Sequence, residues 1–257
     1  MAMGPEPEGI CVATHQGALF KLPREIRDEI YSYLVKSSYI LAFWTHPKFN
    51  ADLSILRVSK AVSHEAIHVL YTESIFRSEL NLYGRYIPYK QYSKEVTSCM
   101  MKLKYDILGF DAGSNWFEPE RSAWENKKLV CEDTIDHFTG TDITRNYMHI
   151  RFWLTQMNVT TLTIPLTQTL KKLGGFRTVT VELCSDPLMI KAQLASEYMK
   201  EKMQAIEAHL ESALGPAALE CYGSPGTVDY HGYLTFHPHQ YLVTKSESEM
   251  EGRASNG

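Results

Sequence analysis

The chain has 257 residues, of which 44% are hydrophobic, and its formal net charge is -4 at pH 7. A chain of this length and composition can bury one sizeable core or two smaller ones. Binding to a phosphate backbone needs clustered Lys and Arg, so the charge balance predicts no nucleic-acid partner.

The cysteines and the N-terminus bear on the cellular compartment. The five cysteines are scattered, odd in number and without a Cys-x-x-Cys pair, which argues against a disulfide framework and a cysteine zinc site. Residues 1–18 are acidic and rich in Pro and Gly, unlike a signal peptide, and no apolar run is long enough to span a bilayer. We therefore predict a disordered tail over 1–18 and an intracellular protein, cytoplasmic or nuclear, with no membrane partner.

Residues 19–80 are predicted to form a helical unit. A first helix runs from about Pro23 to Leu34, because Pro suits the first helical position and an apolar stripe follows. That stripe consists of Ile26, Ile30, Tyr33 and Leu34. A second helical region runs from about Leu53 to Tyr71, with a break near Ser59. Its stripe consists of Val58, Val62, Ala66, Val69 and Leu70. The two stripes predict a packed helical pair.

Residues 81–245 are predicted to form an α/β domain. Residues 101–107, 148–154 and 178–183 alternate apolar and polar side chains with the period of a half-buried strand. The last of these is the clearest strand, whereas 148–154 could equally be one face of a helix. Residues 111–134 are charged and rich in turn-forming residues, which indicates a surface insertion.

A short helix, a long helix and a final strand complete the predicted domain. The short helix covers Pro165 to Leu173 and ends at Gly174-Gly175, and the long one follows Asp186 as N-cap and stops at Gly215. The last strand covers Tyr233 to Phe236, and residues 246–257 are a disordered polar tail. The fold class is therefore α+β (mixed α/β): a helical unit packed on a mixed sheet flanked by helices, including one long C-terminal helix.

Two sequence segments of the helical unit resemble those of a known family. The first helix begins Leu22-Pro23-x-Glu25-Ile26-x-x-x-Ile30-x-x-Tyr33-Leu34. The second region contains Leu56-Arg57-Val58-Ser59-Lys60, then Glu65-Ala66, Leu70-Tyr71 and Phe76. The first phrase resembles the opening helix of an F-box, and both together are similar to the fungal F-box-like group.

The resemblance implies a non-enzymatic interaction protein. An F-box docks on the Skp-type adaptor of a cullin-type ubiquitin ligase, and the rest of the chain then recruits a protein target. The adaptor-facing residues implied by the resemblance are Leu22, Pro23, Ile26, Ile30, Leu56 and Val58. The alternative is a self-contained α/β scaffold, of unknown role, that binds no adaptor.

Residues 64–68 match the His-Glu-x-x-His pattern of zinc peptidases. In that chemistry His64 and His68 would bind Zn²⁺ and Glu65 would activate the bound water. A third ligand is missing, since Tyr71 and Ser74 stand where a metzincin has its Gly and its third His. Helical geometry also turns both histidines away from the apolar stripe. We therefore predict solvent-exposed histidines, with no metal, no cofactor and no catalytic residue, and keep a zinc peptidase as the less favoured alternative.

Three further histidines lie close together near the C-terminus. On a strand, His237 and His239 would share one face with metal-ligand spacing, and His231 is near in sequence. Pro238 weakens that strand, so this segment predicts a structural turn.

Overall fold

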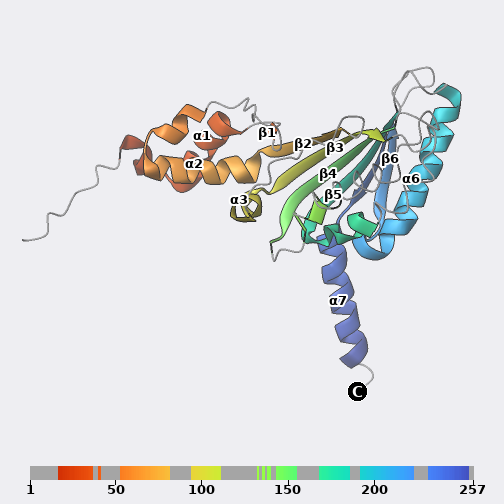
Figure 1. The fold of residues 1–257 in the computed structure, drawn as a ribbon. Coiled ribbons are helices and arrows are strands. Elements are labelled where there is room, and N and C mark those ends of the chain that lie inside the picture. Colours follow the sequence, from red (N-terminus) through yellow and green to blue (C-terminus); the bar gives the residue numbers. More distant parts are fainter. Residues whose placement is uncertain are drawn as a thin grey trace, which may run out of the picture.

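In the part of the chain that the structure describes, seven strands form one sheet in the order β1-β2-β3-β4-β5-β7-β6 (Figure 1). The strands are β1 (Ile40–Leu41), β2 (Ile75–Asn81), β3 (Lys102–Phe110), β4 (Arg145–Leu154), β5 (Phe176–Ser185), β6 (Ala217–Tyr222) and β7 (His231–Phe236). Strands β1 to β5 pair in parallel, whereas β7 is antiparallel to both β5 and β6. The predicted mixed α+β class is confirmed.

The structure is a computed structural model. It describes residues 17–36, 40–41, 53–81, 94–110, 132, 135–136, 138–139, 143–154, 168–185, 192–222 and 231–254. Most of the predicted insertion at 111–134 and the predicted N-cap Asp186 lie outside these residues. Of the predicted tail over 1–18, residues 1–16 lie outside them, and Ala18 is the first residue of a 3-10 helix.

The helices lie at the ends and on one face of the sheet. They are η1 (Ala18–Lys21), α1 (Arg24–Val35), η2 (Leu53–Arg57), α2 (Lys60–Glu73), α3 (Lys94–Cys99), η4 (Lys171–Gly175), α6 (Ala192–Leu214) and α7 (Pro238–Ala254). In Figure 1, α1 and α2 lie beyond the β1–β2 end of the sheet, while α7 extends away from it towards the C-terminus. None of the described helices combines the length and the apolar character that a membrane crossing requires.

The structure changes two predicted boundaries. The boundary at residue 80 falls inside β2, which starts at Ile75 directly after α2, and β1 also belongs to the sheet. The helical unit therefore supplies two strands to the sheet and is continuous with it. The prediction of a disordered tail over 246–257 is wrong up to Ala254, because α7 is helical to that residue.

The two faces of the central strands differ in chemistry. Residues 103–107 of β3 are all buried, so this strand is covered on both faces and is not half-buried as predicted. In register across β3, β4, β5 and β7, one face carries only apolar side chains and a glycine. These residues are Leu103, Tyr105, Ile107, Met148, Ile150, Phe152, Val179, Val181, Leu183, Gly232, Leu234 and Phe236. The opposite face is polar.

Helix α6 covers the apolar face. Its buried side chains are Met203, Ile206, Leu210 and Leu214, which belong to the apolar stripe of the predicted long helix. A Cβ on Gly232 would lie 2.9 Å from the Cγ of Met203, so helix and strand approach closely there. The helix ends at Gly215, where φ is +84° and the amide donates to Glu211, as expected for a glycine stop.

Helix α1 turns a different face inward from the one predicted. Its buried side chains are Tyr31 and Val35, whereas Ile26 is 43% exposed and Tyr33 is 90% exposed. Helix α2 begins after the predicted break near Ser59, whose side chain caps the first turn by accepting from the amide of Val62 at 3.2 Å. Val58 of the predicted stripe precedes the helix and is 66% exposed. The residues buried along α2 are Val62, Ala66, Val69 and Leu70.

A buried arginine ties β4 to the preceding segments. Arg145 is 1% exposed, and its guanidinium donates to the carbonyls of Met100, Thr97 and Phe138 at 2.8 to 3.2 Å. It also lies 5.8 Å from the ring centroids of Phe138 and Phe176. This side chain therefore supplies hydrogen-bond donors to three backbone carbonyls in the interior.

Candidate functional site

A carboxylate on α2 holds α1 in place. Glu65 accepts two hydrogen bonds from the guanidinium of Arg27, at 2.7 and 2.9 Å, and a third from the hydroxyl of Tyr31 at 2.9 Å. Arg24 approaches the same carboxylate at 3.4 Å. We call Arg27, Tyr31 and Glu65 the helix clamp. The hydrogen bonds from Arg27, assisted by that from Tyr31, lower the pKa of Glu65 to about 2 although burial opposes this.

The clamp removes Glu65 from any peptidase chemistry. A zinc peptidase needs this glutamate beside a metal-bound water, but both of its oxygens face α1 and accept hydrogen bonds there. His64 and His68 are exposed, as predicted from the helical geometry. The His-Glu-x-x-His match therefore does not assemble the arrangement that its chemistry requires.

The residues predicted to face an adaptor lie mostly at the surface. Leu22, Pro23, Ile26 and Val58 are exposed, and Val58 reaches 66%. Ile30 and Leu56 are partly buried. Because Tyr31 and Val35 face inward, Ile26 and Tyr33 of the predicted stripe are exposed, whereas Leu34 packs against the core. Both helices of the unit thus keep large apolar side chains at the surface.

An open groove borders this surface along η2 and the first half of α2. Its volume is about 570 Å³. Its lining residues are Leu56, Arg57, Ser59, Lys60, Ser63, His64 and Ile67. The lining combines the apolar side chains of Leu56 and Ile67 with the cations Arg57 and Lys60. The groove can accept an apolar side chain from a partner that also carries carboxylates.

The second candidate site is the polar face of the sheet. Asp106, Arg151 and Glu182 lie directly opposite one another on β3, β4 and β5. Asp106 and Glu182 are fully buried, Arg77 donates to Asp106, and Arg151 donates to Glu182. Two residues earlier on the same strands, Lys104 of β3 and His149 of β4 also lie directly opposite each other. The sheet therefore buries charged groups in alternating sign across three strands.

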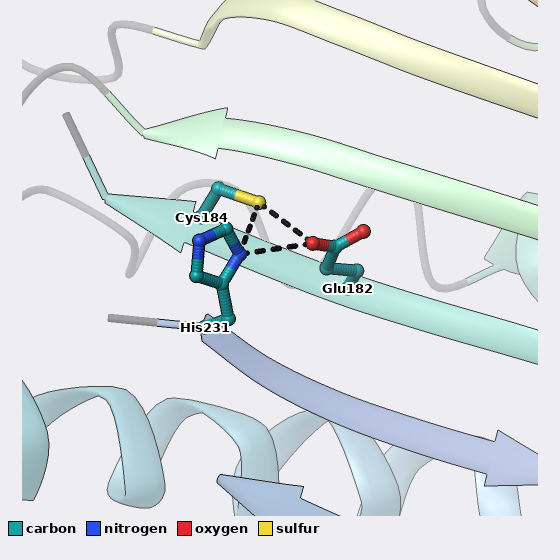
Figure 2. A group of neighbouring side chains, drawn as sticks. All are labelled: Glu182, Cys184 and His231. Carbon is teal, nitrogen blue, oxygen red and sulfur yellow. Dashed lines mark hydrogen bonds and ion pairs between the residues drawn. The ribbon is translucent and has the colours of Figure 1, made fainter. Parts of the chain in front are cut away.

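Glu182 is the centre of this polar face. Its Oε2 contacts the Nε2 of His149 at 2.7 Å and also accepts from Arg151. Its Oε1 lies 3.1 Å from the Sγ of Cys184 and 3.0 Å from the Nδ1 of His231. Figure 2 shows the side chains of Glu182, Cys184 and His231 pointing toward one another from β5 and β7. Cys184 and His231 are themselves in register, with Sγ and Nδ1 3.2 Å apart.

Burial and the charge of Glu182 set the protonation of this cluster. Burial raises the pKa of Glu182, but the hydrogen bonds from His149 and Arg151 lower it by more, so the carboxylate is ionised. Burial, followed by the charge of Glu182, raises the pKa of the Cys184 thiol well above its usual range. The same two causes raise the pKa of Tyr233 to about 12. The cluster thus holds one anion, one neutral thiol and one neutral phenol.

The sequence analysis missed this cluster. The alternation over 148–154 and 178–183 predicts half-buried strands, and this does not place His149, Arg151 or Glu182 in a common buried site. The signal in the sequence was that ionisable residues occupy the polar positions of consecutive strands. Of the three C-terminal histidines, only His231 joins the cluster. His237 follows the other end of β7 and His239 lies in the first turn of α7, so the segment predicted to be a structural turn begins a helix. Both histidines are exposed.

In comparisons with family models, with curated proteins and with solved structures, nothing matches this chain.

Proposed function

We propose that this chain is a non-enzymatic interaction protein whose N-terminal helical unit binds a Skp-type adaptor. In that role it is a substrate-recruiting subunit of a cullin-type ubiquitin ligase and acts inside the cell. The observation that carries the proposal is the exposure of Leu22, Ile26 and Val58, the side chains for which the F-box-like resemblance implies adaptor contact.

The surface chemistry supports docking over a self-contained scaffold. A scaffold would cover the apolar stripe of α1 with its own sheet, but Ile26 and Val58 are exposed and Ile30 is only partly buried. Exposed apolar side chains that gather on adjoining elements are typical of protein-interaction surfaces. The clamp holds α1 against α2, so the surface is presented without an ordering cost at binding.

The remainder of the chain would select the target. The sheet is continuous with the helical unit through β2, so a target held on the sheet would be carried at a fixed distance from the adaptor. We propose a protein target, because the resemblance implies one.

Binding to a purified Skp-type adaptor tests the proposal. Full-length chain and adaptor are mixed and analysed by calorimetry and by size-exclusion chromatography. We expect a one-to-one complex, and we expect Ile26→Asp to weaken it by about 30-fold or more, as for a buried interface anchor. Val58→Asp is expected to act in the same direction.

The matched control lies on α7. Val243 is 44% exposed, almost the same fraction as Ile26 at 43%, so Val243→Asp makes the same chemical change at an equally exposed helical site. It should leave adaptor binding unchanged. No complex with the wild-type chain, or an equal loss of binding with Val243→Asp, would contradict the proposal. Circular dichroism of each variant checks that the helices persist.

A further inference from the structure

Three potential metal ligands converge on one point of the polar face. The Oε1 of Glu182, the Sγ of Cys184 and the Nδ1 of His231 lie within 3.0 to 3.2 Å of one another. Glu182 and Cys184 lie two residues apart on the same face of β5, and His231 faces them from β7 (Figure 2). Glu182 and Cys184 are completely buried, whereas His231 is partly exposed. The donors therefore come from rigid, adjacent strands.

The arrangement differs from that of a nucleophilic Cys–His–Glu relay. In a relay the histidine contacts the thiol with one ring nitrogen and the carboxylate with the other. Here Cys184 and Glu182 both contact the same nitrogen, Nδ1 of His231. Two donors aimed at one ring nitrogen indicate a shared centre.

The spacing of the donors fits a tetrahedral ion. Bond lengths of about 2.3 Å to sulfur and about 2.0–2.1 Å to nitrogen and oxygen place tetrahedral donors about 3.3–3.6 Å apart. The three observed distances are shorter by a few tenths of an ångström. A small outward rotation of the side chains would open the space between them to the size of the ion.

The other oxygen of the carboxylate is already held. His149 and Arg151 both contact Oε2 of Glu182, which leaves Oε1 directed at Cys184 and His231. Outer hydrogen bonds of this kind orient a ligand and fix its rotamer. The positioning residues are therefore in place without the ion.

We propose that Glu182, Cys184 and His231 bind a divalent ion of the zinc class, with water in the fourth position. A thiolate and an imidazole favour Zn²⁺ or Co²⁺ over Mg²⁺ or Ca²⁺, which prefer oxygen donors. On binding, the Sγ–H bond of Cys184 breaks, the proton passes to solvent and the sulfur electron pair forms the bond to the metal. The site lies on β5 and β7, so it is independent of the adaptor surface.

Titration of the metal-free full-length chain with Co²⁺ tests the site. We expect one equivalent to bind, with a near-ultraviolet charge-transfer band that requires a thiolate ligand. Zn²⁺ should displace the cobalt and abolish the band. Cys184→Ser and His231→Gln should each remove stoichiometric binding. His149→Gln keeps all three ligands and is expected to weaken the metal by about 10- to 100-fold, as for other outer-shell residues.

Two controls separate this site from other donors. Cys99→Ser changes an exposed thiol on α3, and the double variant His64→Ala/His68→Ala removes the histidine pair on α2. Neither should alter the cobalt band or its stoichiometry. The proposal is overturned if the wild-type chain gives no thiolate band, or if the band persists in Cys184→Ser. Loss of binding in the α2 double variant would equally overturn it.

Discussion

The helix clamp gives a quantitative prediction for Glu65→Gln. The substitution keeps the size of the side chain but removes the negative charge of the carboxylate. That carboxylate accepts hydrogen bonds from the guanidinium of Arg27 and from the hydroxyl of Tyr31. The pKa of Glu65 is about 2 in the folded chain, against an ordinary 4.5. At about 1.4 kcal/mol per pH unit, this difference in pKa limits the stabilisation by the ionised Glu65 to about 3.5 kcal/mol at most.

The expected effect is smaller than that bound. The Glu65 side chain is 13% exposed and Arg24 beside it is largely exposed, so solvent screens the pair. We therefore expect Glu65→Gln to lower the free energy of unfolding at neutral pH by about 1–2 kcal/mol.

The sign of the pH dependence follows from the lowered pKa of Glu65. The stabilisation is complete above about pH 4.5 and is lost as the pH falls through about 2. Urea unfolding followed by circular dichroism at successive pH values measures it. The wild-type and Glu65→Gln curves should be separated at neutral pH and converge in acid. Glu29→Gln, the same change at an exposed position of α1, should leave stability unchanged. Wild-type and Glu65→Gln curves that stay parallel throughout would refute the reasoning.

Two further predictions concern stability and are read from thermal or urea unfolding. Gly215→Ala should destabilise by about 2 kcal/mol or more, because φ is +84° and the new Cβ would lie 2.6 Å from Cγ of Tyr241. Gly17→Ala, where no atom lies within 4 Å, is its control, and equal effects would contradict the argument. Arg145→Lys should cost about 3 kcal/mol, since an ammonium cannot reach all three carbonyls. Arg177→Lys, at an exposed position of β5, should cost nothing measurable.

Sequence reasoning worked where the signal is local. The break before Ser59, the end of the long helix at Gly215 and the strand around Val181 each follow from residues within a few positions of one another. Capping and period-two alternation are properties of short segments, so one sequence suffices to find them.

The inward face of α1 could not be found in this way. Hydrophobicity favours Ile26 for the core, but the structure buries Tyr31 and pairs Arg27 with Glu65, which is 38 residues away. A long-range ion pair leaves no trace in helical periodicity. The apolar stripe therefore does not mark the inward face of α1: Ile26 and Tyr33 are exposed, and Leu34 packs against the core.

The buried polar face of the sheet could not be predicted from the sequence for a related reason. An alternating strand has the same pattern whether its polar side meets water or other charged side chains. Only the register of β3, β4 and β5 brings Asp106, Arg151 and Glu182 together, and the contact to His231 spans 49 residues. The proximity of the candidate ligands therefore depends on the order and register of the strands.

The position of β7 has a consequence for how the sheet opens. In the sheet, β6 joins the parallel strands only through β7, so the antiparallel pair can detach as one cooperative unit. Detachment would hydrate the carboxylate of Glu182 and separate it from His231. Amide protons on both strands should then share one free energy of opening, larger than that of the chain ends and smaller than that of β4. Occupation of the three-ligand site would slow this shared exchange, and the isotope label would report it strand by strand.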